Sequence, residues 1–86
     1  MSYALAFTAD ARYDLGELDF NLQELVLDEL DRVAASQTLT TGNTFVRDIV
    51  HELPGIRHYL FLHLAVDLPR STLVILGIHH HGRQID

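Results

Sequence analysis

Histidine and arginine side chains gather in the second half of this sequence. All six histidines and four of the six arginines follow Asn43, and the chain has no lysine. An imidazole, with an unperturbed pKa of about 6.5, can take up or release a proton near neutral pH. A guanidinium can hold two phosphate oxygens at once. Together these groups suit cleavage of RNA by attack of a ribose 2′-hydroxyl, which needs a base, a proton donor and a cation.

Seven residues are candidates for this chemistry if the strands that carry them are neighbours. For catalysis the candidates are Arg57, His63, His80, His81 and Arg83. For substrate binding they are His79 and Tyr59, whose ring can stack on a base. We leave out His51 and His58, because His58 falls on the face of its strand that we expect to line the core.

Several of these residues also have purely structural interpretations. Arg57 can pair with Glu52 or Asp67 on the sheet surface. His63 lies in an apolar strand, where a histidine is more often structural than functional. Tyr59 can simply cover the sheet, and Arg83 can be solvated near the end of the chain. These alternatives stay open at the level of the sequence.

The run of three consecutive histidines also raises the question of a metal site. In a strand, His79 and His81 share one face and His80 lies on the other, so His63 or a carboxylate would have to complete a zinc site. The chain has no cysteine and no helical pair of metal-binding histidines with a glutamate between them. We therefore expect no metal and no cofactor.

Hydrophobic periodicity predicts the elements that position these residues. The expected elements are a strand at Tyr3–Phe7, a helix from about Ala9 to Gly16, a longer helix from Asp19 to about Ser36, and strands at Phe45–Glu52, Ile56–Val66 and Ser71–His80. Thr8 and Asp19 are the expected N-caps, and the polar segment Gln37–Asn43 is an expected loop. Turns are expected around Gly55 and Pro69.

The element order β-α-α-β-β-β predicts an α+β fold for residues 1–86, taken as a single domain. A helical hairpin packs on one face of a mainly antiparallel sheet, and the other face is left to water or a partner. In the strand Ile56–Val66 the even-numbered residues are expected to face the core, and Arg57, Tyr59, Phe61 and His63 the other side. That other side is where we expect the function.

Composition and charge limit the function further. The chain has 86 residues, of which 48% are hydrophobic, so it suits one small globular domain and excludes a multidomain enzyme. Its net charge of −6 lies entirely in the half before Asn43, and argues against sequence-blind binding to free nucleic acid. The acidic face of the long helix is most simply a solvated surface.

Nothing in the sequence indicates export or a membrane. The first ten residues lack a basic residue and a long apolar run, as a signal peptide would need, and no stretch approaches the roughly 20 apolar residues of a membrane span. The lack of cysteine is compatible with a reducing compartment. We expect a soluble, cytoplasmic protein with no membrane partner.

Three segments resemble the RelE/ParE superfamily, the toxin subunits of type II toxin–antitoxin pairs. The segment ALAFTADARYDLGEL is similar to the first strand and the A-x-x-D-L helix of the family, through Ala11, Asp14 and Leu15. HELPGIRHYLFLHLAVD resembles an L-x-G-x-R turn and the strand after it, with the arginine at Arg57. ILGIHHHGRQID resembles the last strand and its tail, with the family histidine at His80 and a following arginine at Arg83.

The resemblance implies a small toxin that a cognate antitoxin neutralises in a hetero-oligomer. Members similar to RelE cleave messenger RNA on the ribosome, and members similar to ParE inhibit DNA gyrase without being nucleases. We expect a ribosome-dependent mRNA endonuclease; the alternative is a gyrase inhibitor, or a decayed toxin that only binds its antitoxin. The chain departs from the family in its lack of lysine and in Gly77, where ParE-like chains often have arginine. A family arginine of the third strand falls at His63 or Leu64, depending on the register.

Overall fold

The computed structural model describes residues 3–36 and 44–85 of the chain. In chain order its elements are β1 (Ala4–Phe7), α1 (Ala9–Gly16), α2 (Phe20–Ala35), β2 (Thr44–Leu53), β3 (Ile56–Asp67) and β4 (Thr72–Gln84). This confirms the predicted β-α-α-β-β-β order. The loop predicted for Gln37–Asn43 lies outside the described residues.

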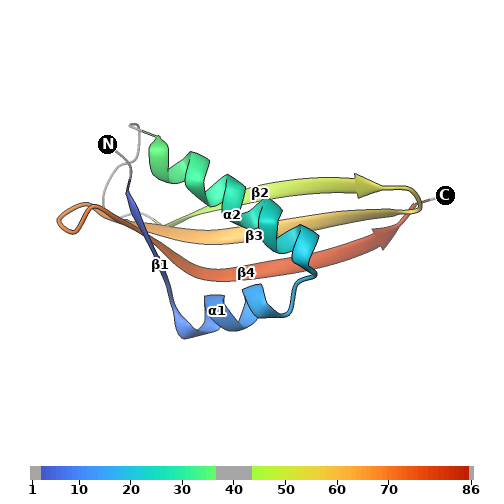
Figure 1. Cartoon of the computed structure of the whole chain (residues 1–86), viewed down its shortest axis with the longest axis horizontal. Helices are drawn as coiled ribbons and strands as arrows, with labels where there is room; N and C mark the ends of the chain where they lie inside the picture. The colour runs from blue at the N-terminus through green and yellow to red at the C-terminus, as the bar shows by residue number, and fades with distance from the viewer. Residues whose placement is uncertain (1–2, 37–43, 86) are drawn as a thin grey trace.

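The four strands form one sheet in the order β1-β4-β3-β2. β1 runs parallel to β4, whereas β4, β3 and β2 pair antiparallel to their neighbours. Figure 1 shows α2 crossing over one face of the sheet and α1 packed beside β4, and this arrangement confirms the predicted α+β fold. The three long strands continue past the beginning of α2, so this end of the sheet has no helix over it (Figure 1).

The core lies between α2 and the central strands. Leu22, Val26, Leu30 and Val33 of α2 are buried, as their helical spacing predicted. They belong to one apolar cluster with fully buried side chains of β3 and β4, namely Leu60, Leu62, Leu64, Leu73 and Ile75. Each such side chain contributes about 1.5–3 kcal/mol of hydrophobic stabilisation. The predicted core face of β3 is therefore confirmed from Leu60 to Val66.

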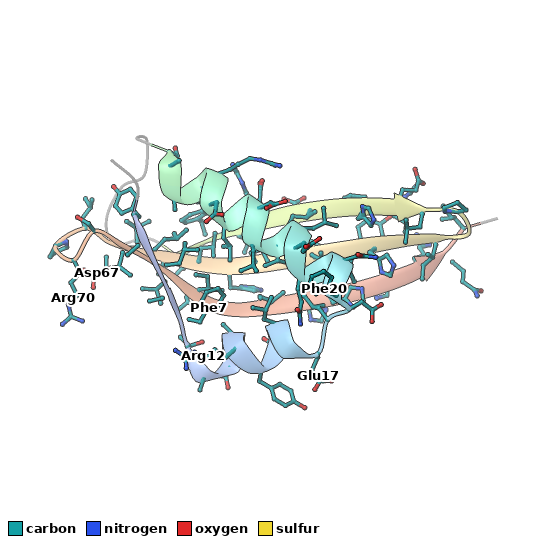
Figure 2. The ribbon with its side chains drawn as sticks, in the orientation of Figure 1. Phe7, Arg12, Glu17, Phe20, Asp67 and Arg70 are labelled. Carbon is teal, nitrogen blue, oxygen red and sulfur yellow. The ribbon has the colours of Figure 1, made fainter. Side chains whose placement is uncertain are left out.

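The turns between the long strands use backbone conformations that suit their residues. Gly55, with φ of 85°, follows Pro54 in the β2–β3 turn, and glycine takes this left-handed conformation without strain. Ser71, with φ of 49°, ends the β3–β4 turn, where Asp67 accepts a hydrogen bond from the backbone N–H of Arg70. Figure 2 shows Asp67 and Arg70 at this end of the sheet, far from Phe20 at the start of α2.

The last strand is longer than predicted. β4 extends to Gln84, four residues beyond the expected end at His80, because β3 offers it backbone partners as far as Ile56. Ala4 and Ala6 of the edge strand β1 are exposed. No helix in the described ranges is both long and apolar enough to cross a membrane.

Candidate functional site

The side of the sheet away from the helices is here called the open face. Cross-strand partners share a face, so the register assigns its residues row by row. Each row has one residue from β2, one from β3 and one from β4. Beyond the row Thr44–Ala65–Val74, four rows carry the candidate residues: Val46–His63–Gly77, Asp48–Phe61–His79, Val50–Tyr59–His81 and Glu52–Arg57–Arg83.

Six of the seven candidate residues lie on this open face. Tyr59 pairs with His81, and Arg57 pairs with Arg83 in the next row toward the β2–β3 turn. In the other direction, His79 lies one row and His63 two rows from the row of Tyr59 and His81. The structure therefore brings Arg57, Tyr59, His63, His79, His81 and Arg83 together, as expected if β3 and β4 are neighbours.

His80 does not lie with the other candidates, which corrects its grouping with them. It pairs with Leu60, whose side chain is fully buried on the helix side of the sheet. Since partners share a face, His80 also lies on the helix side, opposite His79 and His81. It cannot act in one site with His81 without a change in the strand.

A β-bulge in β4 decides which histidines reach the open face. Leu73 and Ile75 are buried on the helix side, but beyond an irregularity opposite His63 and Leu64 the next buried residue is Ile78. This shift by one residue reverses the alternation. Without the bulge, simple alternation from Ile75 would point His79 and His81 toward the helices.

Side chains at the start of α1 and within it form hydrogen bonds to the backbone of β4 at this bulge. The Thr8 hydroxyl donates to the carbonyl oxygen of Leu76 at 2.9 Å, and it accepts from the N–H of Ala11 as the predicted N-cap of α1. Asp14 Oδ2 accepts a hydrogen bond from the backbone N–H of Ile78 at 3.0 Å. Because β1 pairs with β4 only up to Ile75, these two side chains take over where β1 ends.

Arg57 is held by neighbours on the open face. Its Nε donates to Glu52 Oε1 at 3.1 Å, and its Nη2 forms an ion pair with the same oxygen. Its Nη1 donates to the Tyr59 hydroxyl at 3.4 Å. The hydrogen bonds to Tyr59 and to Glu52 raise the pKa of Arg57 above its usual value. Of the two structural partners considered from the sequence, Glu52 is the one observed, while Asp67 pairs with Arg70.

Two aromatic rings of β3 support imidazoles of β4. The ring centroids of Tyr59 and His81 are 6.3 Å apart, and those of Phe61 and His79 are also 6.3 Å apart. Phe61 was not among the sequence candidates, although the alternation of β3 already placed it on this face. The four rings lie in two adjacent rows and together offer flat surfaces on which bases can stack.

His63 occupies an exposed position of the face. Its partners are Val46 on one side and Gly77, which has no side chain, on the other. The neighbouring Leu64 is fully buried. Of the two residues between which the sequence left the choice, His63 is therefore the one that can meet a ligand.

A second group of histidines lies on the helix side, beyond the start of α2. His51 and His58 have ring centroids 6.5 Å apart, and His58 and His80 have centroids 5.1 Å apart. His58 Nδ1 lies 2.9 Å from His80 Nε2. Burial, followed by the charge of His58, lowers the pKa of His80. His58 is on the expected face, but it contacts histidines there in place of the apolar core.

Within residues 3–36 and 44–85, no group of three or more histidine, cysteine, aspartate or glutamate side chains is placed to hold a metal ion. His79 and His81 do share a face, with His80 on the other, as the strand geometry predicted.

Comparison with solved structures identifies the fold. A chain in the RelBE2 toxin–antitoxin complex from Mycobacterium tuberculosis matches with a TM-score of 0.62 and 24% identity, over 94% of this chain and 93% of that one. A mutant of the E. coli toxin RelE in the free state matches with a TM-score of 0.65 and 20% identity, over 91% and 82% of the two chains. This chain has the RelE fold. The intact E. coli RelBE complex agrees, with a TM-score of 0.60 and 17% identity over 90% and 94%.

The RelE fold confirms the architecture expected from the sequence motifs. No protein-family model and no curated protein matches the chain by sequence. With identities of 17–24%, the structural matches establish the fold, and the roles of individual side chains rest on this chain's own geometry. One motif residue gains a physical reason in this way: Asp14 caps the N–H of Ile78 at the bulge.

Proposed function

We propose that this protein is the toxin subunit of a type II toxin–antitoxin pair and cleaves messenger RNA on the ribosome. The observation that carries the proposal is the gathering of Arg57, Tyr59, His63, His79, His81 and Arg83 on the open face of a RelE-like sheet. Two of the matching structures are toxin–antitoxin complexes, which supports a cognate antitoxin as the protein partner. Because ribosomes translate messenger RNA in the cytoplasm, the proposed activity implies a cytoplasmic protein.

The open face provides the groups that cleavage by a ribose 2′-hydroxyl requires. His79 and His81 are two residues apart in β4, which separates them by about 6.6–6.8 Å along the strand. Rings at this spacing can flank one phosphate, one acting as the base and the other as the acid. Arg83, in the next row, is the guanidinium best placed to stabilise charge on the phosphate oxygens.

The aromatic residues of β3 have a separate role in the proposal. Tyr59 and Phe61 lie beside His81 and His79, so a base stacked on either ring would bring its phosphate toward an imidazole. Stacking on an aromatic side chain contributes about 1–3 kcal/mol per base. The same rings therefore position the RNA that the histidines act on.

The charge of the protein gives a physical reason why the reaction would need the ribosome. A net charge of −6 without lysine gives the isolated protein little attraction for free RNA. A messenger already held on the ribosome is presented at high effective concentration, so weak intrinsic affinity suffices. Dependence on translation is the expected consequence.

Cell-free translation followed by primer extension tests the proposal. The wild-type protein should produce new cuts in a translated messenger and none in the same RNA without ribosomes. The His81→Gln variant should cleave about 10²–10⁴-fold more slowly, the typical contribution of a general acid or base. The matched control is His51→Gln, on the helix side, which should cleave as the wild type does. The absence of new cuts at a toxic protein concentration would reject nuclease activity.

A non-enzymatic function is the second candidate, and one observation favours it. Glu52 compensates the charge of Arg57, and Asp48 adds a further carboxylate to the face that would have to accept RNA. A gyrase inhibitor or a decayed toxin that only holds its antitoxin would tolerate these acids. Inhibition of supercoiling by purified gyrase would support the first version, and harmless expression without the antitoxin would support the second.

A further inference from the structure

The fixed charges on the four rows of the open face cancel one another. Arg57 and Arg83 supply two positive charges, and Asp48 and Glu52 supply two negative ones. The remaining groups that titrate near neutral pH in these rows are three imidazoles, those of His63, His79 and His81. The face is therefore close to neutral when the imidazoles are neutral, and it gains up to three positive charges when they are protonated.

These imidazoles are accessible to both protons and ligands. His63, His79 and His81 are all exposed. Tyr59 and Phe61 lie beside two of them, and the negative faces of aromatic rings attract a neighbouring cation. The nearest carboxylate of β2 is Asp48, in the row of His79. These neighbours lie on the same face as the imidazoles.

The other charged and titratable groups around these strands have separate contacts and do not belong to the three imidazoles of the open face. On the helix side, His80 contacts His58, and burial and that contact lower its pKa, so it gains a proton only at lower pH. From α1, the Asp14 carboxylate reaches the edge of β4, where it accepts the N–H of Ile78. Arg57 is bound to Glu52 and Tyr59 and keeps its charge at every accessible pH.

We propose that the open face binds single-stranded RNA together with protons, so that the protonation of His79 and His81 sets its affinity for phosphodiesters. This inference rests on the proposed function and adds how RNA binding is regulated. The face binds RNA weakly in a neutral or alkaline cytoplasm and tightly after acidification. A face built on lysine or arginine would hold its charge and show no such dependence.

Thermodynamic linkage fixes the sign and size of the effect. A bound phosphate stabilises the imidazolium form, so RNA raises the pKa of each imidazole that it contacts. Above the free pKa of about 6.5, each proton taken up on binding raises the affinity by up to tenfold for every pH unit of acidification. Two participating histidines therefore give a dependence steeper than one proton can produce.

Fluorescence anisotropy with a labelled single-stranded oligouridylate measures this linkage directly. At constant low ionic strength, the wild-type protein should bind at least about tenfold more tightly near pH 6 than near pH 8. Circular dichroism at both pH values verifies that the protein remains folded. An affinity that is the same at both pH values would overturn the inference.

Paired variants assign the effect to the two histidines. His79→Gln/His81→Gln should bind weakly and almost equally at both pH values, whereas His51→Gln, on the helix side, should behave as the wild type. His79→Arg/His81→Arg carries fixed charges and should bind near pH 8 about as tightly as the wild type does near pH 6. A glutamine variant that kept the full pH dependence would also overturn the inference.

The binding and cleavage assays separate failure of this inference from failure of the proposed function. Cleavage in the translation assay by a protein whose RNA affinity ignores pH would refute the proton linkage and leave the nuclease proposal intact. Proton-linked RNA binding without any cleavage would support the proton linkage and refute the nuclease proposal. The same oligonucleotide made of DNA shows how far the face requires the ribose 2′-hydroxyl.

Discussion

His58 Nδ1 and His80 Nε2 lie 2.9 Å apart across β3 and β4, on the helix side of the sheet. One ring has to donate and the other to accept, so the contact cannot survive when both imidazoles carry two protons. Burial and the charge of His58 lower the pKa of His80, which shows that the folded protein favours its neutral form. This pair joins β3 and β4 on the helix side, where the charge of Asp19, the N-cap of α2, also acts on His80.

The free energy of unfolding should therefore fall as the solution is acidified. Because the pKa of His80 is lower in the folded state, the unfolded chain binds more protons between that value and about 6.5. The stabilisation is complete above pH 6.5 and is lost as the pH falls through the folded value. Urea denaturation at several pH values should show this slope. His80→Gln should reduce it, and His63→Gln, on the open face, should leave it unchanged; equal slopes for wild type and His80→Gln would contradict the assignment.

The bulge in β4 should depend on Asp14. Its carboxylate accepts the N–H of Ile78, and hydrogen bonds to charged groups contribute about 1.5–3 kcal/mol. Asp14→Ala should therefore lower the free energy of unfolding by that order. Asp14→Asn, which keeps an oxygen acceptor, should lose less, and Asp10→Ala, in the exposed first turn of α1, should have a smaller effect.

Protection of the Ile78 amide tests whether the loss is local. Hydrogen exchange of this amide should accelerate in Asp14→Ala more than that of Leu62, the partner of Ile78 in the sheet. If both amides exchanged faster to the same degree, Asp14 would stabilise the protein as a whole without a particular role at the bulge.

The sequence was sufficient for the elements and for the faces of β3, because its residues alternate without interruption from Ile56 to Val66. It was insufficient for β4, where a bulge at Leu76 reverses the alternation. The placement of His79 and His81 depends on hydrogen bonds from Thr8 and Asp14, more than 60 residues away in the chain. Local periodicity contains no signal for contacts of this range.

The grouping of His80 with the other candidates shows a second limit. The three adjacent histidines suggested one site, but a strand separates neighbours onto opposite faces. Phe61 shows the converse: its position on the open face was predictable, yet an aromatic residue in an apolar strand gives no sign of function until His79 is seen beside it.

The two leucines at positions 27 and 30 of α2 should differ strongly when truncated. Leu30 is fully buried, whereas Leu27 is 39% exposed. Leu30→Ala should lower the free energy of unfolding by about 2–5 kcal/mol, the range for a buried leucine. Leu27→Ala, with the same change in helix propensity, should cost much less. Chemical denaturation measures both values, and similar costs would mean that α2 does not pack as described.

Removing the charge of Glu52 should strengthen RNA binding at neutral pH if the open face is the RNA-binding surface. Glu52 holds the guanidinium of Arg57, so Glu52→Gln leaves Arg57 able to contact a phosphate. The slope of log affinity against log salt should steepen by about 0.7, the value for one added contact with a single strand. Because the ion pair is exposed, its loss should have little effect on stability.

Glu24→Gln provides the matched control, since it removes the same charge from the exposed, acidic face of α2. A general effect of net charge would raise RNA affinity equally in both variants, because each changes the total from −6 to −5. A local site predicts the increase and the steeper salt slope for Glu52→Gln alone. Equal behaviour of the two variants would mean that RNA does not bind near Arg57. It would then also argue against RNA binding at Arg83, which pairs with Arg57 in the row next to His81.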